Sequence, residues 1–406
     1  MASQPNFGNV EPPPHVPPDR IVDFDYLHPE GFDGRDIYAA LKRLHDGPDI
    51  LWSPRYGGHW IVTRAEDMRW IRSEPVLFSR TEFVIPRGSM NTLMPPVNVD
   101  PPYHARFRAV INPAFAPGAV RRLQESARDT AARLIARLKP RGACEFVDEV
   151  ARVMPATVFF AMLELPLEQT EQSLIWARDY INAKDQETKD RTFAVVAEFL
   201  TTVLDEREAN PGTDLFSRIA AWRKHPRFQC EEEVIGMAMT CFLGGLDTTA
   251  SLMAFTMHHL ATHPEARRRL IQDPALIPRA AEEYIRRNGL GISGRLLTRD
   301  VTRKGVTLKR DEMVMLIDAL ASLDERVYPN AFAIDYGRDN RTHDTFGNGV
   351  HRCVGEHLAR MELIVLIEEW LKAIPEFQLD PELLPRTYSG VAIGMEQLGL
   401  RWNLTC

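Results

Sequence analysis

The chain has 406 residues, of which 44% are hydrophobic and 26% are charged, a composition typical of globular proteins rather than of disordered or fibrous ones. Its formal net charge of −7 argues against nucleic acid as a general partner. The longest uncharged run, Val234 to Leu246, is shorter than the roughly twenty residues that cross a bilayer, so we expect no membrane span.

The N-terminal segment combines no basic stretch with an apolar core, so no signal peptide is expected. The five cysteines follow no pairing pattern, which predicts a reducing, cytoplasmic location. Prolines crowd the beginning of the chain and predict an extended arm over residues 1–20. No linker, charge block or repeat interrupts the remainder, so we expect one domain over residues 21–406.

The remainder predicts a mainly helical fold with a small β region. A hairpin is expected around residues 59–63, which follow two glycines and are rich in β-formers. Apolar residues at helical spacing predict helices over residues 118–138, 146–163, 188–209, 232–262, 276–288 and 355–373. Short strands are expected at residues 305–308 and within residues 391–402.

The predicted helix over residues 232–262 contains the run GGLDTT at residues 244–249. Two glycines inside a helix cost about 1 kcal/mol each relative to alanine, so the run needs a compensating role. One interpretation is close helix packing, with Asp247 in a surface ion pair. The other is a helix opened by a hydrogen bond from the Thr248 hydroxyl to the Gly244 carbonyl, with Asp247 and Thr248 able to handle protons.

Residues 346–355 read FGNGVHRCVG and place Cys353 just before the last predicted long helix. Gly347 and Gly349 permit a positive φ, so backbone N–H groups can turn towards the sulfur. The positive end of the helix dipole also favours the thiolate, which suits a haem iron. The alternatives are a buried cysteine that acts as a small hydrophobe and a structural zinc site, although paired ligands at short spacing are missing.

This loop resembles the haem-binding loop of the cytochrome P450 family, the haem-thiolate monooxygenases, and the resemblance covers nearly the whole chain after the arm. It implies the mainly α cytochrome P450 fold, a haem b cofactor (iron protoporphyrin IX) and Cys353 as the metal ligand. It also implies that Phe346 contacts the haem. Soluble members of this family point to a bacterial source.

The resemblance assigns further site residues. It implies that Asp247 and Thr248 are the acid–alcohol pair that delivers protons during oxygen activation. Four basic residues are implied to bind the haem propionates, namely His104, Arg108, Arg295 and His351. Glu283 and Arg286, which can pair on one helix, are implied to form a structural trio with Arg338 that braces the segment before the cysteine loop.

Residues 83–99 resemble the irregular loop that covers the substrate in this family. The implied pocket is apolar with few polar anchors, and ordinary core packing is the alternative for each of its residues: Phe83, Thr92, Leu93, Met94, Val97, Thr240, Leu243, Gly244, Gly291, Ile292, Val391 and Ala392. The runs GGLDT, SGRLLT and LDER are similar to those of bacterial terpenoid hydroxylases of the camphor type. No tyrosine that could bind a ketone occurs between Phe83 and Asp100, so another monoterpenoid or a norisoprenoid (ionone-like) is expected, and Gly291 is interpreted as enlarging the pocket.

The implied reaction inserts one atom of O2 into a C–H bond of a small apolar substrate. Because no flavin or nicotinamide domain is appended, we expect electrons from a 2Fe–2S ferredoxin with its NAD(P)H-dependent reductase, and a monomeric enzyme. Arg106, Arg352 and Arg360 are either a cationic patch for that acidic ferredoxin or unrelated surface arginines. The rival hypothesis is a haem-based binding or sensing protein without turnover, against which the Asp247–Thr248 pair argues.

Overall fold

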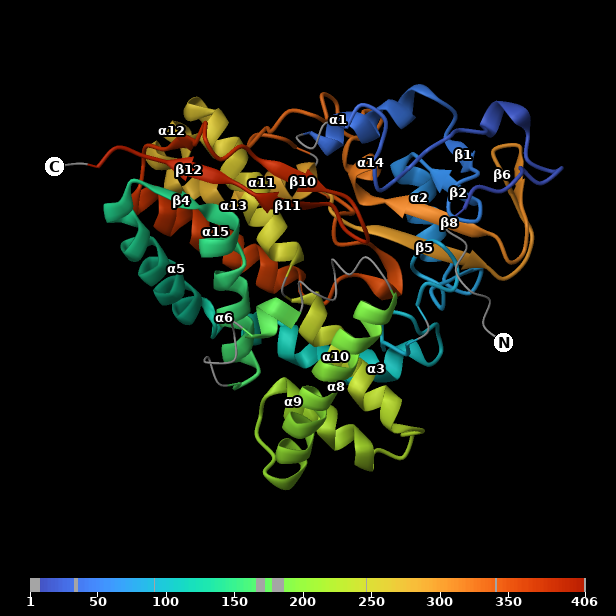
Figure 1. Ribbon diagram of the computed structural model, residues 1–406, viewed down its shortest axis with the longest axis horizontal. Helices are drawn as coiled ribbons and strands as arrows, with labels where there is room; N and C mark the ends of the chain where they lie inside the picture. Colours follow the sequence, from blue (N-terminus) through green and yellow to red (C-terminus); the bar gives the residue numbers. More distant parts are fainter. Residues whose placement is uncertain are drawn as a thin grey trace.

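The computed structural model describes residues 8–32, 36–90, 92–165, 172–176, 186–245, 247–339 and 342–404. Helices form most of the molecule, and the larger sheet lies at one side of it (Figure 1). This confirms the predicted mainly α fold with a small β region. The helices are α1 (Ile37–Lys42), α2 (Ala65–Ser73), α3 (His104–Ile111), α4 (Pro117–Arg121), α5 (Gln124–Leu138), α6 (Val153–Met162), α8 (Gln186–Ala209), α9 (Leu215–Ala220), α10 (Glu231–Gly244), α11 (Thr248–Thr262), α12 (Pro264–Gln272), α13 (Ile277–Arg287), α14 (Asp318–Ser322) and α15 (Glu356–Ala373).

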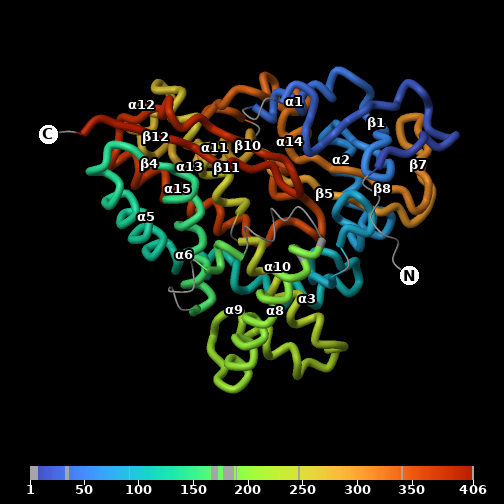
Figure 2. Tube along the Cα trace, viewed as in Figure 1, coloured from blue at the N-terminus to red at the C-terminus, as the bar shows by residue number. Residues whose placement is uncertain are grey.

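The largest sheet joins the beginning of the chain to its later part, as the blue and orange segments of Figure 2 show. Its strand order is β1 (Ile50–Ser53), β2 (His59–Val62), β8 (Met313–Ile317), β5 (Ile292–Leu297) and β3 (Phe78–Ser79). Strands β1 and β2 form the predicted hairpin, with Ser53 opposite His59. Strand β8 runs parallel to β2 and antiparallel to β5, and every residue of β1, β2 and β8 is buried.

Three smaller sheets complete the β region. Strands β6 (Val301–Arg303) and β7 (Val306–Leu308) form a hairpin, and β12 (Gly399–Arg401) pairs with both β4 (Ala143–Glu145) and β9 (Gln378–Leu379). Strands β10 (Arg386–Tyr388) and β11 (Gly394–Gln397) pair with each other, and β11 lies against α11. The strands predicted near residues 305–308 and within residues 391–402 are confirmed.

The proline-rich beginning of the chain contacts the large sheet wherever the structure describes it. The Val10 N–H donates to the Pro54 carbonyl over 2.9 Å, and His15 Nε2 lies 2.9 Å from a Glu312 carboxylate oxygen. Val16 is part of the core. The division into an arm over residues 1–20 and a domain over residues 21–406 stays a prediction.

Three predicted helices are interrupted. The helix over residues 118–138 is divided into α4 and α5 because Arg122 and Leu123 donate to carbonyls three residues earlier, which tightens the turn. The helix over residues 146–163 begins with a π-helical turn at Val147–Ala151 before α6. The helix over residues 232–262 ends at Gly244 and starts again at Thr248, so the prediction of one continuous helix there was wrong.

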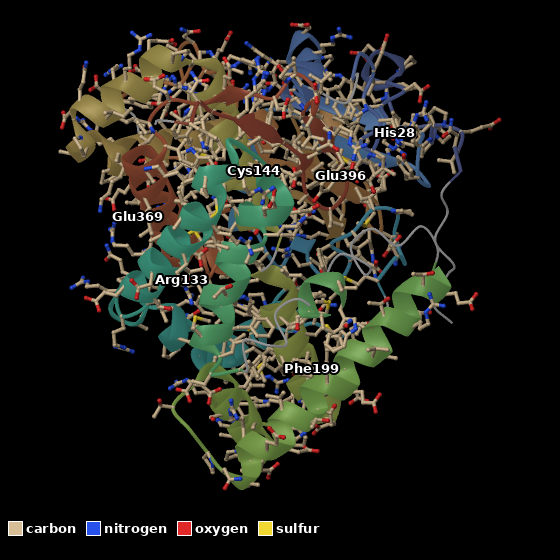
Figure 3. The ribbon with its side chains drawn as sticks, turned by 60° about the vertical axis from the view of Figure 1, so that its left-hand side comes forward. His28, Arg133, Cys144, Phe199, Glu369 and Glu396 are labelled. Atoms are coloured by element: carbon tan, nitrogen blue, oxygen red, sulfur yellow. The ribbon has the colours of Figure 1, made fainter. Side chains whose placement is uncertain are left out.

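Helix pairs build the rest of the core. Helices α5 and α15 lie side by side, as Arg133 and Glu369 mark in Figure 3, and Arg128 joins them by donating to Glu368 over 2.5 Å. Helix α8 packs on α10, with the Phe199 and Phe242 ring centroids 6.3 Å apart. In the described part of the chain, no helix combines the length and the apolar character that crossing a membrane requires.

Candidate active site

The cysteine loop has the conformation that its glycines predicted. Gly347 and Gly349 both adopt a φ of 70°. A side chain at position 349 would also come within 2.5 Å of the Arg72 carbonyl oxygen at the end of α2, so glycine is required there for space as well. The Cys353 N–H donates to the Phe346 carbonyl over 2.8 Å, and α15 begins at Glu356 with Gly355 as its N-cap. The loop therefore places Cys353 just before the start of α15.

The surroundings of the Cys353 thiol act on its pKa in opposite directions. The residue is exposed, which gives no support to the interpretation of a buried small hydrophobe. Desolvation by the surrounding protein atoms nevertheless raises the pKa of the thiol, against the lowering effects of the Gly355 N–H, Arg108 and Arg360. Glu356, in the first turn of α15, raises the pKa further. A metal cation bound to the sulfur would lower this pKa and favour the thiolate.

Four basic side chains converge beside this loop without an acidic partner for their buried donors. Nε of Arg80, Nε2 of His104 and Nε2 of His351 are buried and have no hydrogen-bond partner among the residues that the structure describes. The two histidine rings lie 4.3 Å apart between centroids. Arg295, on β5, is 4% exposed and donates to the Ser293 hydroxyl and the Gly294 carbonyl.

These basic groups destabilise one another's charged forms. Burial, and then Arg80 and Arg72, lower the pKa of the Arg295 guanidinium, and burial with Arg72 lowers that of Arg80 to about 10. Burial with the nearby arginines lowers the pKa of His104 to about 4 and that of His351 to about 2. Buried donors that repel each other fit an anionic ligand with several acceptor oxygens, as the two carboxylates of a haem provide.

Sequence reasoning found three members of this group and missed Arg80. Arg80 follows β3, and β3 pairs with β5 so that Ser79 lies opposite Leu296, next to Arg295. Only this strand pairing brings the two arginines together. Arg108, the fourth predicted propionate ligand, donates to the Arg352 carbonyl over 3.0 Å and lowers the pKa of Cys353. It also lowers the pKa of His104 and of His351, and its binding to a propionate stays a prediction.

The predicted trio that braces the cysteine segment is confirmed. Arg286 donates to both carboxylate oxygens of Glu283 over 2.9 Å, and Arg338 donates to the same carboxylate over 3.0 Å. Arg286 also donates to the carbonyls of Ser322, Ala331 and Ala333, so α13 is tied to the chain that leads to the cysteine loop.

The break between α10 and α11 contains the predicted proton-handling pair. An added side chain at Gly244 would meet no atom of the described residues within 4 Å, whereas one at Gly245 would press on the Phe159 ring at 3.1 Å. Thr248 is exposed. The Asp247 side chain does not cap α11 but accepts a hydrogen bond over 2.6 Å from the Tyr388 hydroxyl, at the end of β10. Sequence reasoning missed Tyr388, for which no local pattern gave a signal.

The predicted substrate-contacting residues lie in three regions of the fold: the turn at residues 92–97, helix α10, and the chain around β5. Thr92, Leu93, Met94 and Val97 form a turn closed by Asn98, which donates to the Thr92 carbonyl and accepts from the Met94 N–H. Leu243 is partly buried, and the Thr240 hydroxyl on α10 is buried without a partner. The Phe83 carbonyl accepts from Gly294 N–H, the Val391 carbonyl accepts from Ile292 N–H, and Gly291 bridges Ala392.

Gly291 has a different role from the one expected. A side chain there would come within 2.5 Å of an Asp318 carboxylate oxygen. Asp318 is in turn paired with Arg72. The glycine therefore leaves room for a buried ion pair, and the interpretation that it enlarges the substrate pocket finds no support in its surroundings.

The expected cationic patch is mostly neutralised. Arg106 forms a buried ion pair with Glu233, and Arg360 binds Glu282 and Glu356. Arg352 alone of the three has a side chain that is half exposed, at 52%, and it pairs with Glu356. A metal site of three His, Cys, Asp or Glu side chains does not occur among the described residues, so the zinc interpretation of Cys353 gains no support.

Comparison with known proteins identifies the family. The profile described as Cytochrome P450 matches residues 289–388. The chain is 31% identical to the probable cytochrome P450 127A1 of Sinorhizobium fredii over 96% of both chains, and 29% identical to the mycinamicin IV hydroxylase/epoxidase of Micromonospora griseorubida over 95% of both.

Solved structures agree with this identification. The crystal structure of cytochrome P450 CYP101C1 superimposes with a TM-score of 0.90 at 33% identity, covering 97% of this chain and 100% of that one. CYP101J2 gives a TM-score of 0.89 at 31% identity with the same coverage. The buried donors suit a haem, the cysteine loop offers a ligand for its iron, and this chain belongs to the cytochrome P450 family of monooxygenases.

Proposed function

We propose that this enzyme inserts one atom of O2 into a C–H bond of a small apolar molecule, a monoterpenoid or a norisoprenoid such as an ionone. The observation that supports the haem-dependent reaction is the group of buried, unpartnered basic donors beside the cysteine loop. Haem b would supply oxygen activation. The relatives' names include a mycinamicin IV hydroxylase/epoxidase, a nocardicin C N-oxygenase and a vitamin D(3) 25-hydroxylase, which act on different substrates, so the substrate class is argued from the pocket.

In this proposal the sulfur of Cys353 would bind the haem iron, Phe346 would contact the haem from the loop side, and Arg108 would contribute to binding the propionates. Arg80, Arg295, His104 and His351 hold the two propionates, which would satisfy the donors that are now buried without acceptors. The charge of the carboxylates would also relieve the repulsion between the two guanidinium groups of Arg80 and Arg295. The sequence-based set is thereby extended by Arg80.

Asp247 and Thr248 are proposed to carry protons into the site. A carboxyl group and a hydroxyl group at a helix break can exchange a proton with each other or through one water, because the break frees them from the regular helix geometry. Gly244, with open space around its Cα, would admit oxygen or substrate next to them. In this proposal the apolar turn at residues 92–97 covers the Asp247–Thr248 pair and keeps bulk water away from it.

The proposed lining favours an apolar ligand with at most one polar anchor. Phe83, Leu93, Met94, Val97, Leu243, Val391 and Ala392 offer carbon surface, Gly291 contributes backbone, and Thr92 offers a hydroxyl. The buried Thr240 hydroxyl has no partner and can bind one ketone or hydroxyl of the substrate. This combination supports oxygenated terpenoids over saturated hydrocarbons.

A titration of the ferric, haem-loaded protein with monoterpenes, oxygenated monoterpenes and ionones tests the substrate class. Binding that displaces the iron-bound water appears as a shift of the Soret band from low to high spin. We expect oxygenated monoterpenes or ionones to give the largest shift, and Thr240→Val to weaken them about tenfold relative to hydrocarbons of the same size. A panel in which fatty acids or macrolides bind and terpenoids do not would contradict this substrate class.

Electrons are proposed to come from a 2Fe–2S ferredoxin and an NAD(P)H-dependent reductase. Arg352 is exposed on the chain just before Cys353 and can meet an acidic partner on that side. Because Arg106 and Arg360 are committed to internal ion pairs, the salt dependence of association should be shallow. Measuring NADH oxidation against ionic strength with ferredoxins of different charge tests this part of the proposal.

A further inference from the structure

The carboxylate of Asp247 is held from outside its own helix. It stands at the position before α11 where an aspartate commonly caps the helix, yet it makes no capping hydrogen bond. Instead, one of its oxygens, Oδ2, accepts from the Tyr388 hydroxyl over 2.6 Å, a bond across 141 positions of the chain. A hydrogen bond of this length to a carboxylate is of the strong, charge-assisted kind.

The Tyr388 ring occupies space that is free because the residue opposite it is a glycine. Tyr388 is the last residue of β10 and lies opposite Gly394 of β11. A Cβ at position 394 would overlap the Cζ and hydroxyl oxygen of Tyr388, so any residue other than glycine there would displace the ring. Because β11 also lies against α11, the sheet presents the phenol directly to the helix that Asp247 precedes.

The hydrogen of the Tyr388 hydroxyl points at Asp247. Burial and Asp247 raise the pKa of the phenol, against the lowering effects of the Ser251 hydroxyl on α11 and of Arg152, so the phenol stays protonated. Because a phenol has a single hydrogen to donate and Oδ2 of Asp247 accepts it, that carboxylate oxygen is occupied as long as Tyr388 holds its proton.

We propose that Tyr388 is a positioning residue for Asp247, whose hydroxyl occupies Oδ2 so that Asp247 takes up and releases its proton at Oδ1. The proton lost from Oδ1 passes to the Thr248 hydroxyl or to a water bound to it, which in turn releases one of its own protons to the O2 that is being reduced. A proton from bulk solvent, carried through water, restores Oδ1. Tyr388 remains neutral throughout. This inference rests on the proposed role of Asp247 and Thr248.

The test compares Tyr388→Phe with Tyr336→Phe in the haem-loaded enzyme with its reductase and ferredoxin. Tyr336 is a matched control because it also makes a buried 2.6 Å hydrogen bond, to Tyr284, outside the site. Tyr388→Phe should leave the haem content and the spin-state titration unchanged. It should lower product formed per NADH about tenfold, release the missing electrons as hydrogen peroxide and raise the solvent deuterium isotope effect. The control should do none of these.

A second measurement needs no turnover. With 3-fluorotyrosine at position 388, the ¹⁹F resonance of the ferric protein should shift when Asp247→Asn is introduced. Gly394→Ala should cause the same uncoupling as Tyr388→Phe, while Gly118→Ala, where a Cβ meets no atom within 4 Å, should not.

The outcomes separate the two proposals. If Asp247→Asn and Thr248→Ala uncouple the enzyme but Tyr388→Phe stays coupled and the ¹⁹F resonance does not move, Tyr388 has no positioning role and the proton pair stands. If none of the three variants uncouples the enzyme, the proposed proton delivery itself is wrong.

Discussion

The two sides of the site are built in opposite ways. Around the cysteine loop, the Glu283–Arg286–Arg338 trio is almost fully buried, and Gly349 touches the backbone of α2. At the helix break, Gly244 has open space around it, Thr248 is exposed, and Asp247 is held by a bond to a distant tyrosine. The metal-ligand side is thus fixed by many redundant contacts, whereas the side that must admit ligands and protons is held by few.

The largest effect is expected at the ligand itself. Cys353→Ser should abolish the absorption band typical of thiolate coordination in the reduced, carbon-monoxide-treated protein, together with all substrate oxidation. Cys241→Ser, a buried cysteine on α10, is the matched control and should keep the band. A Cys353→Ser protein with an unchanged spectrum would remove the basis of the proposed haem site.

Breaking the redundant side should cost stability. Glu283→Gln removes the charge that two buried arginines share, which we expect to lower the free energy of unfolding by about 3–5 kcal/mol. Glu325→Gln, in an exposed pair with Lys42, should leave the urea midpoint nearly unchanged. Urea midpoints of the haem-loaded proteins measure both changes, and equal midpoints would contradict a bracing role for the trio.

Changing the open side should alter chemistry and leave stability nearly unchanged. Thr248→Ala removes an exposed hydroxyl, so its urea midpoint should stay close to that of the parent protein. Product formed per NADH should fall by about a hundredfold, with the electrons recovered as hydrogen peroxide. Thr262→Ala, near the other end of α11, is the control. Full coupling in Thr248→Ala would show that protons enter by another route.

The basic group gives the smallest effect and one whose sign depends on haem. Because Arg80 is desolvated beside Arg72 and leaves a buried donor unpartnered, Arg80→Leu should stabilise the haem-free protein by about 1 kcal/mol. In the haem-loaded protein the same change removes a propionate partner. The rate at which haem transfers to apomyoglobin, added in excess as an acceptor, should therefore rise several-fold. Arg141→Leu, in an exposed pair with Glu149, should change neither. A lower stability of the haem-free Arg80→Leu protein would contradict the proposed electrostatics.

The two sides of the site also differ in how far their structure could be predicted from the sequence. The cysteine loop was readable because positive φ at two glycines and a cysteine before a helix are local properties, encoded within ten residues. The pairing of Glu283 with Arg286 follows from their spacing on one helix turn. The end of α10 at Gly244 was not predicted: the sequence pattern is periodic on both sides and predicts one continuous, locally opened helix.

The sequence by itself determined the family, the conformation of the cysteine loop and the positions of most helices. These features depend on hydrophobic periodicity and on glycine conformations, which are properties of a few neighbouring residues. Tertiary structure decided which charged side chains are neutralised by internal ion pairs and which can bind a ligand or a partner. Strand pairing brought Arg80 beside Arg295, an internal ion pair removed Arg106 from the surface, and the sheet of β10 and β11 carried Tyr388 to Asp247. Each of these contacts joins distant segments, where the spacing of residues in the sequence carries no geometric information.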